Sequence, residues 1–517
     1  MVNQFLKHYR LVISTLSPIH IGCGEDYEPT NYVVHDRCLY PLYDHALTNA
    51  FADRVKREDL ARAVSGQPDL RKLQQLYNQQ SDLPFLADRF VPMTEQASTR
   101  HKQWATSTGQ NCVIERTIYN PATGYPILPG TSLKGAIRTA ILNVKADQDK
   151  MIPIPYSGKP KELETRLLGG SFETDPMRHL KIGDADFQDI MGNDSAYIMT
   201  RHSRHRKDGT TTSTGDASQN LVECATPFMP RCFVADVTES AEWKFNVTME
   251  CNQYYFRKVF MEQIKILNAM GLSWWGDQFK SHIADAIGKN SGFLLQVGKN
   301  CGADTLSIKK FMKLRTKHNT ALPLSTTLCG IENNFLSPFG WLFVEILPDN
   351  FELPLIPLVE ELNNARSKLF PKDGKVRMTN FVSNKKEVGK RLAIEKENRE
   401  HEAEAKRIAE EQRQAKTARE AAEKAVREAR LTAMTPNQRK IEDLRMQIVQ
   451  SPIPQPISGK LWQDANKLVA NAEKGEWMPD EKAELNQVCR EELPGKLKDA
   501  AKKLKELHAR LGKLMVG

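Results

Sequence analysis

The chain has 517 residues, with 73 Lys and Arg against 64 Asp and Glu, which gives a formal net charge of +9. One hydrophobic core does not organise a chain of this length, so we expect two to four domains. A hydrophobic content of 40% and ordinary amounts of Gly and Pro exclude a mostly disordered or fibrous protein. The positive excess favours an anionic partner, although a charge that only aids solubility explains it equally well.

The nine cysteines are scattered, and no two of them have the Cys-x-x-Cys spacing of a zinc site. We therefore expect no metal and no cofactor, and a reducing compartment, which predicts a cytoplasmic protein. No apolar run has the length of a membrane span, and the first residues contain no signal-peptide pattern, so we expect no membrane association.

Strand and helix patterns are mixed over residues 1–347 rather than strictly alternating, which favours an α+β fold over a doubly wound sheet. Residues 35–37 predict a turn, residues 155–180 are irregular, and the polar segment 44–110 is interpreted as a helical insertion. We expect strands within 9–17, 31–42, 112–120, 125–130, 180–187, 196–202, 231–238, 244–251, 292–297 and 338–347. We expect helices directly after Pro129, over 254–271 and at the end of 292–308.

Beyond residue 348 the sequence becomes rich in Ala, Glu, Lys and Arg. Residues 384–430 have no apolar heptad seam, so they predict a solvated single helix with charge pairs four residues apart rather than a coiled coil. Residues 435–450 predict a capped amphipathic helix, and the Pro-rich segment 451–459 predicts a linker. Residues 493–515 predict a further helix, with lysines opposite an apolar stripe of Leu497, Ala501, Leu504 and Leu507.

The stretch ILPGTSLKGAIRTAIL, residues 127–142, is a candidate anion site. With Thr131 or Ser132 as the N-cap, the predicted helix directs Lys134 and Arg138 together toward solvent, four residues apart. An anion between these cations would relieve their repulsion, and Gly130 lets a backbone approach the free N–H groups of the first turn. The alternative is a surface helix with incidental cations. The predicted buried face is formed by Leu133, Ala136, Ile137, Ala140 and Ile141.

Two further glycine segments and one basic run have the same character. Gly298, Lys299 and Gly302 follow a predicted strand, where successive N–H groups form an anion-binding concavity or a tight turn. The segment HIGCGE (20–25) follows another strand. The run RHSRHRK (201–207) opens a low-complexity loop, which either binds a polyanion or is only solvated. Several glycine loops with nearby cations suit a long anionic chain better than a single nucleotide.

Five segments together resemble the RAMP superfamily of CRISPR-associated proteins. They are, in chain order, LSPIHIGCGEDYEP (16–29), YPILPGTSLKGAIRTAIL (125–142), LKIGDADF (180–187), LLQVGKNCG (294–302) and SPFGWLFVEI (337–346). Within this superfamily the sequence is similar to the type III-A (Csm) effector subunit that caps the end of the complex holding the 3′ part of the guide RNA. The resemblance spans about residues 8–347 and leaves the rest of the chain without a counterpart.

The resemblance implies one or two RRM-like, ferredoxin-like domains with a Gly-rich loop, followed here by a mostly helical extension. It divides the chain into an N-terminal RAMP domain (1–155, with the insertion at 44–110), a second half with the Gly-rich loop (156–347), a linker (348–383), charged helices (384–450) and a C-terminal helical segment (451–517). The implied role is non-enzymatic binding of guide RNA along its sugar–phosphate backbone. The implied partners are guide RNA, target RNA, adjacent RAMP subunits and nucleases that trim the guide.

The predicted RNA contacts combine the glycine segments with the cations. They are His20, Gly22, Gly24, Gly130, Thr131, Ser132, Lys134, Arg138, Arg201, Arg204, Arg206, Lys207, Gly298, Lys299 and Gly302. No RNP1 motif is present, which agrees with backbone binding rather than base readout.

Catalytic alternatives stay open for one histidine and three carboxylates. His20 either acts as general acid or base of a guide-processing endoribonuclease or is a packed residue that orders its loop. Asp26 lies in the loop where the resemblance places the catalytic Asp of target-cutting backbone subunits, although its spacing differs. Asp184 and Asp186 alternate on a predicted strand, where they either hold a metal or belong to an ordinary core strand. We favour a protein without catalysis.

Overall fold

The structure is a computed structural model, which describes residues 6–515 apart from 53, 66–69, 107–112, 151–158, 172, 189–195, 208–219, 241–242, 291, 304, 312–324, 333–334, 348–352, 354–355 and 371–372. The low-complexity part of the predicted loop, 208–219, lies outside the described residues. The chain forms two compact units, Met1–Ile394 and Glu395–Gly517. No described helix is both long enough and apolar enough to cross a membrane.

The first unit is built on a sheet with β1 (Leu6–Thr15) at its centre. β1 pairs antiparallel with β12 (Met229–Ser240) on one side and with β16 (Trp341–Leu347) on the other. Segments on both sides of residue 155 therefore share one sheet, and the predicted domain boundaries stay predictions. The strand order is β13-β16-β1-β12-β9-β7, where β13 is Phe293–Gln296, β9 is Ala185–Phe187 and β7 is Ile127–Leu128, and β8 (Leu180–Ile182) also pairs with β12.

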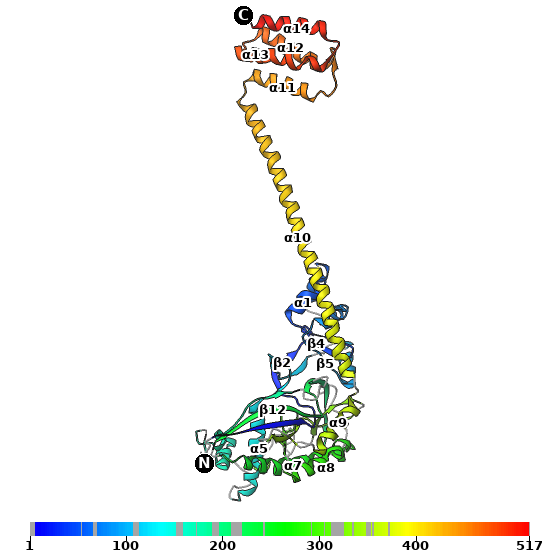
Figure 1. Cartoon of the computed structure of the whole chain (residues 1–517), viewed down its shortest axis with the longest axis vertical. Helices are drawn as coiled ribbons and strands as arrows, with labels where there is room; N and C mark the ends of the chain where they lie inside the picture. Colours follow the sequence, from blue (N-terminus) through cyan, green and yellow to red (C-terminus); the bar gives the residue numbers. More distant parts are fainter. Residues whose placement is uncertain are drawn as a thin grey trace. The chain divides into compact units, whose positions relative to one another are not determined.

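Helices cover one face of this sheet (Figure 1). α5 (Gly130–Gln148) packs on α7 (Phe245–Ala269), and α8 (Trp274–Gly288) lies against α7. The chain order β1, α5, β8/β9, β12, α7, β13 combines with the sheet order β13, β1, β12, β9 as in a ferredoxin-like fold, with β16 inserted between β13 and β1. The α+β prediction is confirmed.

The alternation of side chains in β1 explains which face is covered. Leu11 and Ile13 are fully buried in the core. Arg10, which directly precedes Leu11, points to the other face of the sheet and is exposed. The predicted apolar face of α5 is confirmed, since Leu133, Ala136, Ile137, Ala140 and Ile141 are all buried.

A second sheet contains two of the segments that the sequence predicted as loops: residues 22–25 of HIGCGE and residues 201–206 of the basic run. Its order is β15-β14-β10-β11-β6-β2, with β2 at Gly22–Tyr27, β6 at Ile114–Thr117, β10 at Tyr197–Arg206, β11 at Leu221–Ala225, β14 at Ser325–Gly330 and β15 at Leu336–Ser337. The predicted turn is confirmed: β3 (Tyr32–His35) and β4 (Cys38–Pro41) form a hairpin, with Asp36 and Arg37 in the left-handed region, and β5 (Val91–Pro92) pairs with β4.

The insertion at 44–110 is mostly helical, as predicted. It contains α1 (Asp44–Ala50), α2 (Arg54–Val64), α3 (Leu70–Asn78), a 3₁₀ turn (Leu83–Leu86) and α4 (Glu95–Thr106). Its apolar cluster includes Phe381 from the first part of α10 (Asp373–Ala433), whose ring lies 5.2 Å from that of Phe90. The segment before α10 contains α9 (Pro357–Leu369), which packs on α8 and β12.

Two predictions near the helices are wrong. Residues 244–251 begin α7 rather than form a strand, because Thr248, Cys251 and Tyr255 continue its buried face at helical spacing. The segment predicted to be irregular contains α6 (Pro160–Leu168), which starts with a proline and ends at Gly169 with a φ of 73°.

Three predictions near the loops are also wrong. Residues 201–206 continue β10, because each of them pairs with β14. Residues 22–27 form β2, in which the register with β6 is interrupted between Gly22 and Asp26. The described residues of 303–311 form turns instead of a helix, with Thr305 N–H bonded back to the Gly302 carbonyl.

The second unit is helical. α10 is exposed from Glu395 to Arg430, as predicted for a solvated helix. Thr435 caps α11 (Pro436–Gln450) through a capping box. α11 packs with α12 (Lys460–Lys474), α13 (Pro479–Gln487) and α14 (Ala501–Leu514) around a core of its own (Figure 1). The last predicted helix starts later than expected, since Leu497 lies in β18 (Leu497–Lys498), which pairs with β17 (Gln455–Pro456).

Candidate nucleic-acid interface

Two of the predicted glycine segments cross each other where β1 and β13 end. The Lys299 N–H donates to the His20 carbonyl at 2.8 Å, and Gly340 N–H donates to Pro18 O at 3.0 Å. Gly298 has a φ of +91°, and a Cβ there would lie 2.3 Å from the His20 carbonyl oxygen. Only glycine fits this position. We call the contact between residues 18–21 and 297–302 the loop crossing.

His20 is enclosed within the loop crossing. Its side chain is 1% exposed, with Nδ1 at 2.7 Å from the Glu223 carbonyl oxygen and Nε2 at 3.3 Å from Glu115 Oε2. Both ring nitrogens therefore face oxygen atoms of the protein. This arrangement orders the loop, and it leaves neither nitrogen directed at solvent.

Glu115 on β6 links His20 to Lys299. Lys299 Nζ donates to both carboxylate oxygens, at 2.8 and 2.9 Å, while its side chain stays 57% exposed. The hydrogen bond from His20, followed by that from Lys299, lowers the pKa of Glu115 to about 2 against the opposing effect of partial burial. The carboxylate is thus charged at neutral pH and holds the two loops together.

Strand β10 brings three of the basic residues beside the loop crossing. Its pairing with β14 is unbroken from Arg201 to Arg206, so His202, Arg204 and Arg206 share one face of the strand. Burial lowers the pKa of His202, and the charges of Glu115 and Lys299 both act on it, which places His202 next to the crossing. Arg204 and Arg206 are exposed. We call His202, Arg204, Arg206 and Lys299 the β10 strip.

The amino end of α5 differs from its prediction. Its N-cap is Pro129 rather than Thr131 or Ser132, because the helix already includes Gly130. The Gly130 N–H donates to Asp184 Oδ1 at 2.8 Å, and a Cβ at residue 130 would lie 2.2 Å from the Ile182 carbonyl oxygen. Gly130 thus permits close packing on the β8–β9 turn, and a carboxylate of the chain occupies the anion position.

The two cations of α5 also have partners within the chain. Arg138 bonds to Glu164 at 3.2 Å and to Asp175 at 2.6 Å, and its side chain is 31% exposed. Lys134 Nζ donates to the Leu180 carbonyl at 2.7 Å, and burial lowers its pKa. The expectation that both point freely to solvent is wrong. Their contact with RNA stays a prediction.

The remaining predicted contacts are spread over several elements. Gly22 and Gly24 lie in β2, and Gly24 has a φ of +82° with open space around it. Thr131 and Ser132 lie in the first turn of α5, and Gly302, with a φ of +101°, is the last residue of the loop crossing. Arg201 and Lys207 are half-buried at either end of the basic run. The structure does not bring these residues together at one point.

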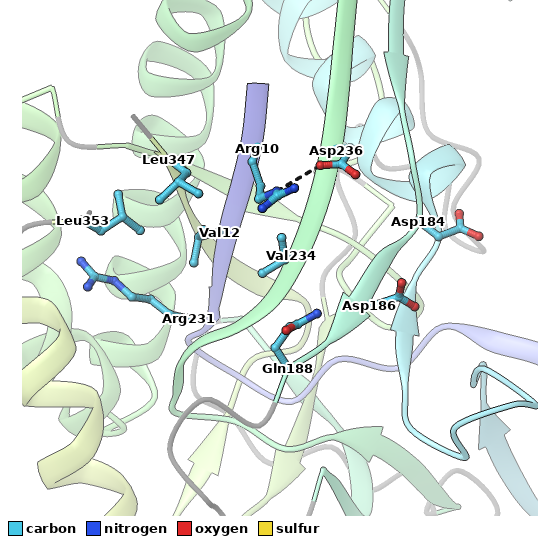
Figure 2. A pocket seen from close by; sticks show the side chains of 10 residues that line it. All are labelled: Arg10, Val12, Asp184, Asp186, Gln188, Arg231, Val234, Asp236, Leu347 and Leu353. Atoms are coloured by element: carbon cyan, nitrogen blue, oxygen red, sulfur yellow. Dashed lines mark hydrogen bonds and ion pairs between the residues drawn. The ribbon is translucent and has the colours of Figure 1, made fainter. Parts of the chain in front are cut away.

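Asp184 and Asp186 lie at a cavity of about 470 Å³ on the sheet face opposite α5 and α7 (Figure 2). Asp186 accepts a weak bond from Asn120 at 3.4 Å. The cations there are engaged: Arg10 bonds to Asp236 at 3.2 Å, and Arg231 bonds to both oxygens of Glu345 at 2.9 Å. None of the described residues that line this cavity is aromatic. Among its described lining residues, this cavity therefore has none of the rings on which RRM domains stack bases.

Asp26 lies at the rim of a separate cavity. It is lined by Glu25, Asp26, Glu28 and Arg116 among others, and Arg116 bonds to Glu25 at 3.0 Å. Within the described part of the chain, no group of three or more His, Cys, Asp or Glu side chains has the geometry of a metal site.

Sequence reasoning missed Glu115 and His202. Glu115 stands in an ordinary strand pattern, and only the folded structure shows that it joins His20 and Lys299. His202 had a visible signal, because the spelling RHSRHR alternates His202, Arg204 and Arg206 on one side of any strand.

A family model of the RAMP superfamily matches residues 12–429. This is well over half of the chain, and the chain therefore belongs to the RAMP superfamily.

Its relatives include two proteins named CRISPR system Cms protein Csm5. The protein of Streptococcus thermophilus is 27% identical over 152 residues, which cover 28% of this chain and 40% of that relative. The protein of Methanocaldococcus jannaschii is 25% identical over 213 residues, covering 36% of this chain and 46% of the relative. The matched region thus spans less than half the length of each of these relatives.

Two solved structures are similar in part. One is a chain of a cryo-EM structure of a Csm-crRNA-target RNA ternary complex in a type III-A CRISPR-Cas system, with 16% identity and a TM-score of 0.45 over 66% of this chain and 100% of that chain. The other is the crystal structure of T. onnurineus Csm5, with 16% identity and a TM-score of 0.42 over 65% of this chain and 99% of that one.

Proposed function

We propose that the chain is a subunit of a type III-A (Csm) RNA-guided effector complex. In this role it caps the complex at the 3′ region of the guide RNA, packs against an adjacent RAMP subunit and aids guide maturation. Membership of the RAMP superfamily and the similarity to Csm5 proteins support the proposal. The proposed partners are guide RNA, target RNA, neighbouring RAMP subunits and trimming nucleases, in the cytoplasm.

The observation that carries the RNA-binding part is the β10 strip beside the loop crossing. Exposed Arg204 and Arg206 lie along one strand face, and Lys299 extends that line of cations onto the Gly-rich loop. Cations in a row neutralise successive phosphates, and such contacts are independent of base sequence. We propose the strip as the main backbone contact, and the other predicted contacts as secondary ones.

The burial of His20 supports a non-catalytic role. A general acid or base has to approach the reacting oxygen, whereas His20 is 1% exposed and bonded on both sides.

The second candidate function is a RAMP endoribonuclease that uses His20, and the third is a target-cutting backbone subunit that uses Asp26. Incubation of the protein with repeat RNA in EDTA tests the second, and incubation of the assembled complex with target RNA and Mg²⁺ tests the third.

The proposal is tested in a reconstituted complex. Replacement of Arg204, Arg206 and Lys299 by Gln is expected to abolish ultraviolet cross-linking of the chain to the 3′ part of the guide and to leave that part open to nuclease. The matched control replaces Lys406, Lys416 and Lys424 of α10 by Gln, which removes the same charge from another exposed surface. Equal cross-linking in both variants would overturn the proposal, and so would metal-independent cleavage of repeat RNA that depends on His20.

A further inference from the structure

Two helices of the second unit carry an unbalanced positive charge. α12 and α14 together contain eight Lys and Arg but only three Asp and Glu. The exposed part of α10, residues 395–433, contains ten of each kind. The excess of cations is therefore a property of α12 and α14 and not of the whole unit. These helices also lie beyond residue 429, where the match to the RAMP superfamily ends.

The lysines are gathered on the outer sides of the two helices. On α12 they recur every seven residues and so share one side, and on α14 the spacings of three and eight place them on one side as well. The apolar residues, such as Leu468 of α12 and Leu507 and Leu511 of α14, are buried between the helices. The exposed set, which we call the lysine face, consists of Lys460, Lys467, Lys474, Lys502, Lys505 and Lys513.

The two rows of lysines meet at one ion pair. Arg510 of α14 bonds to both oxygens of Glu473 of α12, at 2.6 and 2.7 Å. This bond lowers the pKa of Glu473, and the charges of Lys474 and Lys513 lower it further, which places one lysine of each row beside the same carboxylate. The lysine face is thus continuous from α12 to α14.

The lysine face lacks the compensation seen on α10. There, Lys416 pairs with Glu420 and Lys424 with Glu428, one turn apart. In the described part of the second unit, none of the six lysines has a carboxylate within ion-pair distance, although Lys503 next to them bonds to Glu506. Lys502 and Lys505 are like charges about one turn apart and repel each other, so an anion with spaced charges would bind here with a gain in free energy.

A nucleic acid fits this surface better than a protein does. Protein interfaces are centred on buried aromatic or aliphatic anchors, and between its lysines the outer side of α14 offers only Ala509. Lysine ammonium groups are point charges without planar geometry, which suits phosphates at variable spacing. We propose that the lysine face binds the sugar–phosphate backbone of a nucleic acid strand without regard to base sequence. This is a second site, separate from the β10 strip.

The test measures binding of the full chain to labelled oligouridine and to oligothymidine of equal length, over a series of salt concentrations. Replacement of Lys502, Lys505 and Lys513 by Gln is expected to weaken binding of both probes and to reduce the slope of log K against log salt by about 2, because each phosphate contact on a single strand contributes about 0.7. The control variant replaces Lys406, Lys416 and Lys424 of α10 by Gln. Gln keeps a high helix propensity, so circular dichroism is expected to be unchanged in both variants.

Equal slopes in the two variants would overturn the proposal, as would a loss confined to oligouridine, since lysines that contact only phosphate do not distinguish the two sugars. An acidic protein partner predicts equal slopes as well. The variant with substitutions at Arg204, Arg206 and Lys299, measured in parallel, separates this result from the proposed function. If only that variant binds more weakly and with a smaller salt slope, the result supports the β10 strip and overturns the second site.

Discussion

The amino end of α5 and the β10 strip have the same ingredients but different surroundings. Each combines a backbone turn that requires glycine, at Gly130 or at Gly298, with two or three nearby cations. At α5 the chain supplies the anions itself: Asp184 accepts from the Gly130 N–H, and Arg138 bonds to Glu164 and Asp175. At the strip, Arg204 and Arg206 are exposed, and Lys299, which is bonded to the carboxylate of Glu115, keeps a side chain that is 57% exposed.

The difference shows what makes a basic residue available to RNA. A phosphate that approaches α5 meets half-buried cations and has to compete with carboxylates that the fold already holds against Arg138. A phosphate at the strip meets the exposed side chains of Arg204 and Arg206. The carboxylates that pair with Arg138 are Glu164 of α6 and Asp175 of the turn before β8. No pattern in the sequence indicates that these two segments pack against α5. The lysine face differs from the surface of α10 in the same way. Lysines of α10 are paired with glutamates one turn away, whereas in the described part of the second unit the lysines of the lysine face have no carboxylate within ion-pair distance.

The largest effect is expected at the loop crossing, which supports the strip. Gly298→Ala should lower the free energy of unfolding by about 3 kcal/mol, because the added Cβ meets the His20 carbonyl oxygen in a backbone conformation that disfavours side chains. Urea denaturation of the full chain measures it. Gly24→Ala is the matched control: its φ of +82° is similar but nothing lies within 4 Å, so about 1 kcal/mol is expected. Equal losses would show that the crossing is loosely packed.

Sequence reasoning gave the elements of the first unit more accurately than their connections. The α+β class, the hairpin at Asp36 and Arg37, and the buried face of α5 all follow from local periodicity and turn chemistry. The continuation of strand β10 over 203–206 does not, because it exists through pairing with β14, more than a hundred residues away. For the same reason the sequence presented Arg138 as a free cation: its partners Glu164 and Asp175 are brought to it only by the fold.

The second prediction compares the two regions directly by their salt dependence. In full-chain binding to oligouridine, replacement of Arg204, Arg206 and Lys299 by Gln should reduce the slope of log K against log salt by about 2. Replacement of Lys134 and Arg138 by Gln should reduce it by less than about 0.7, one contact or fewer, because both cations are already engaged. A larger change for the α5 pair than for the strip would reverse the comparison.

The third prediction concerns the carboxylate that joins the strip to the crossing. The folded pKa of Glu115 is about 2, below its ordinary value of 4.5, so its contribution to stability is present above about pH 4.5 and is lost as the pH falls toward 2. Glu115→Gln should therefore cost about 2 kcal/mol near neutral pH, and this difference from the unsubstituted chain should shrink below about pH 4.5. Urea unfolding at a series of pH values measures it, and a difference independent of pH would mean that the bonds from His20 and Lys299 to this carboxylate contribute nothing.

The smallest effect is expected at the neutralised end of α5. Arg138→Gln removes two ion pairs of a side chain that is 31% exposed, so the free energy of unfolding should fall by only about 0.5–1 kcal/mol, and by less at high salt. Lys424→Gln on α10 is the control, because its pair with Glu428 is fully in solvent and should contribute about 0.3 kcal/mol or less. If Arg138→Gln instead leaves stability unchanged and weakens RNA binding, the carboxylates around it do not hold this arginine, and the α5 end belongs with the β10 strip among the RNA contacts.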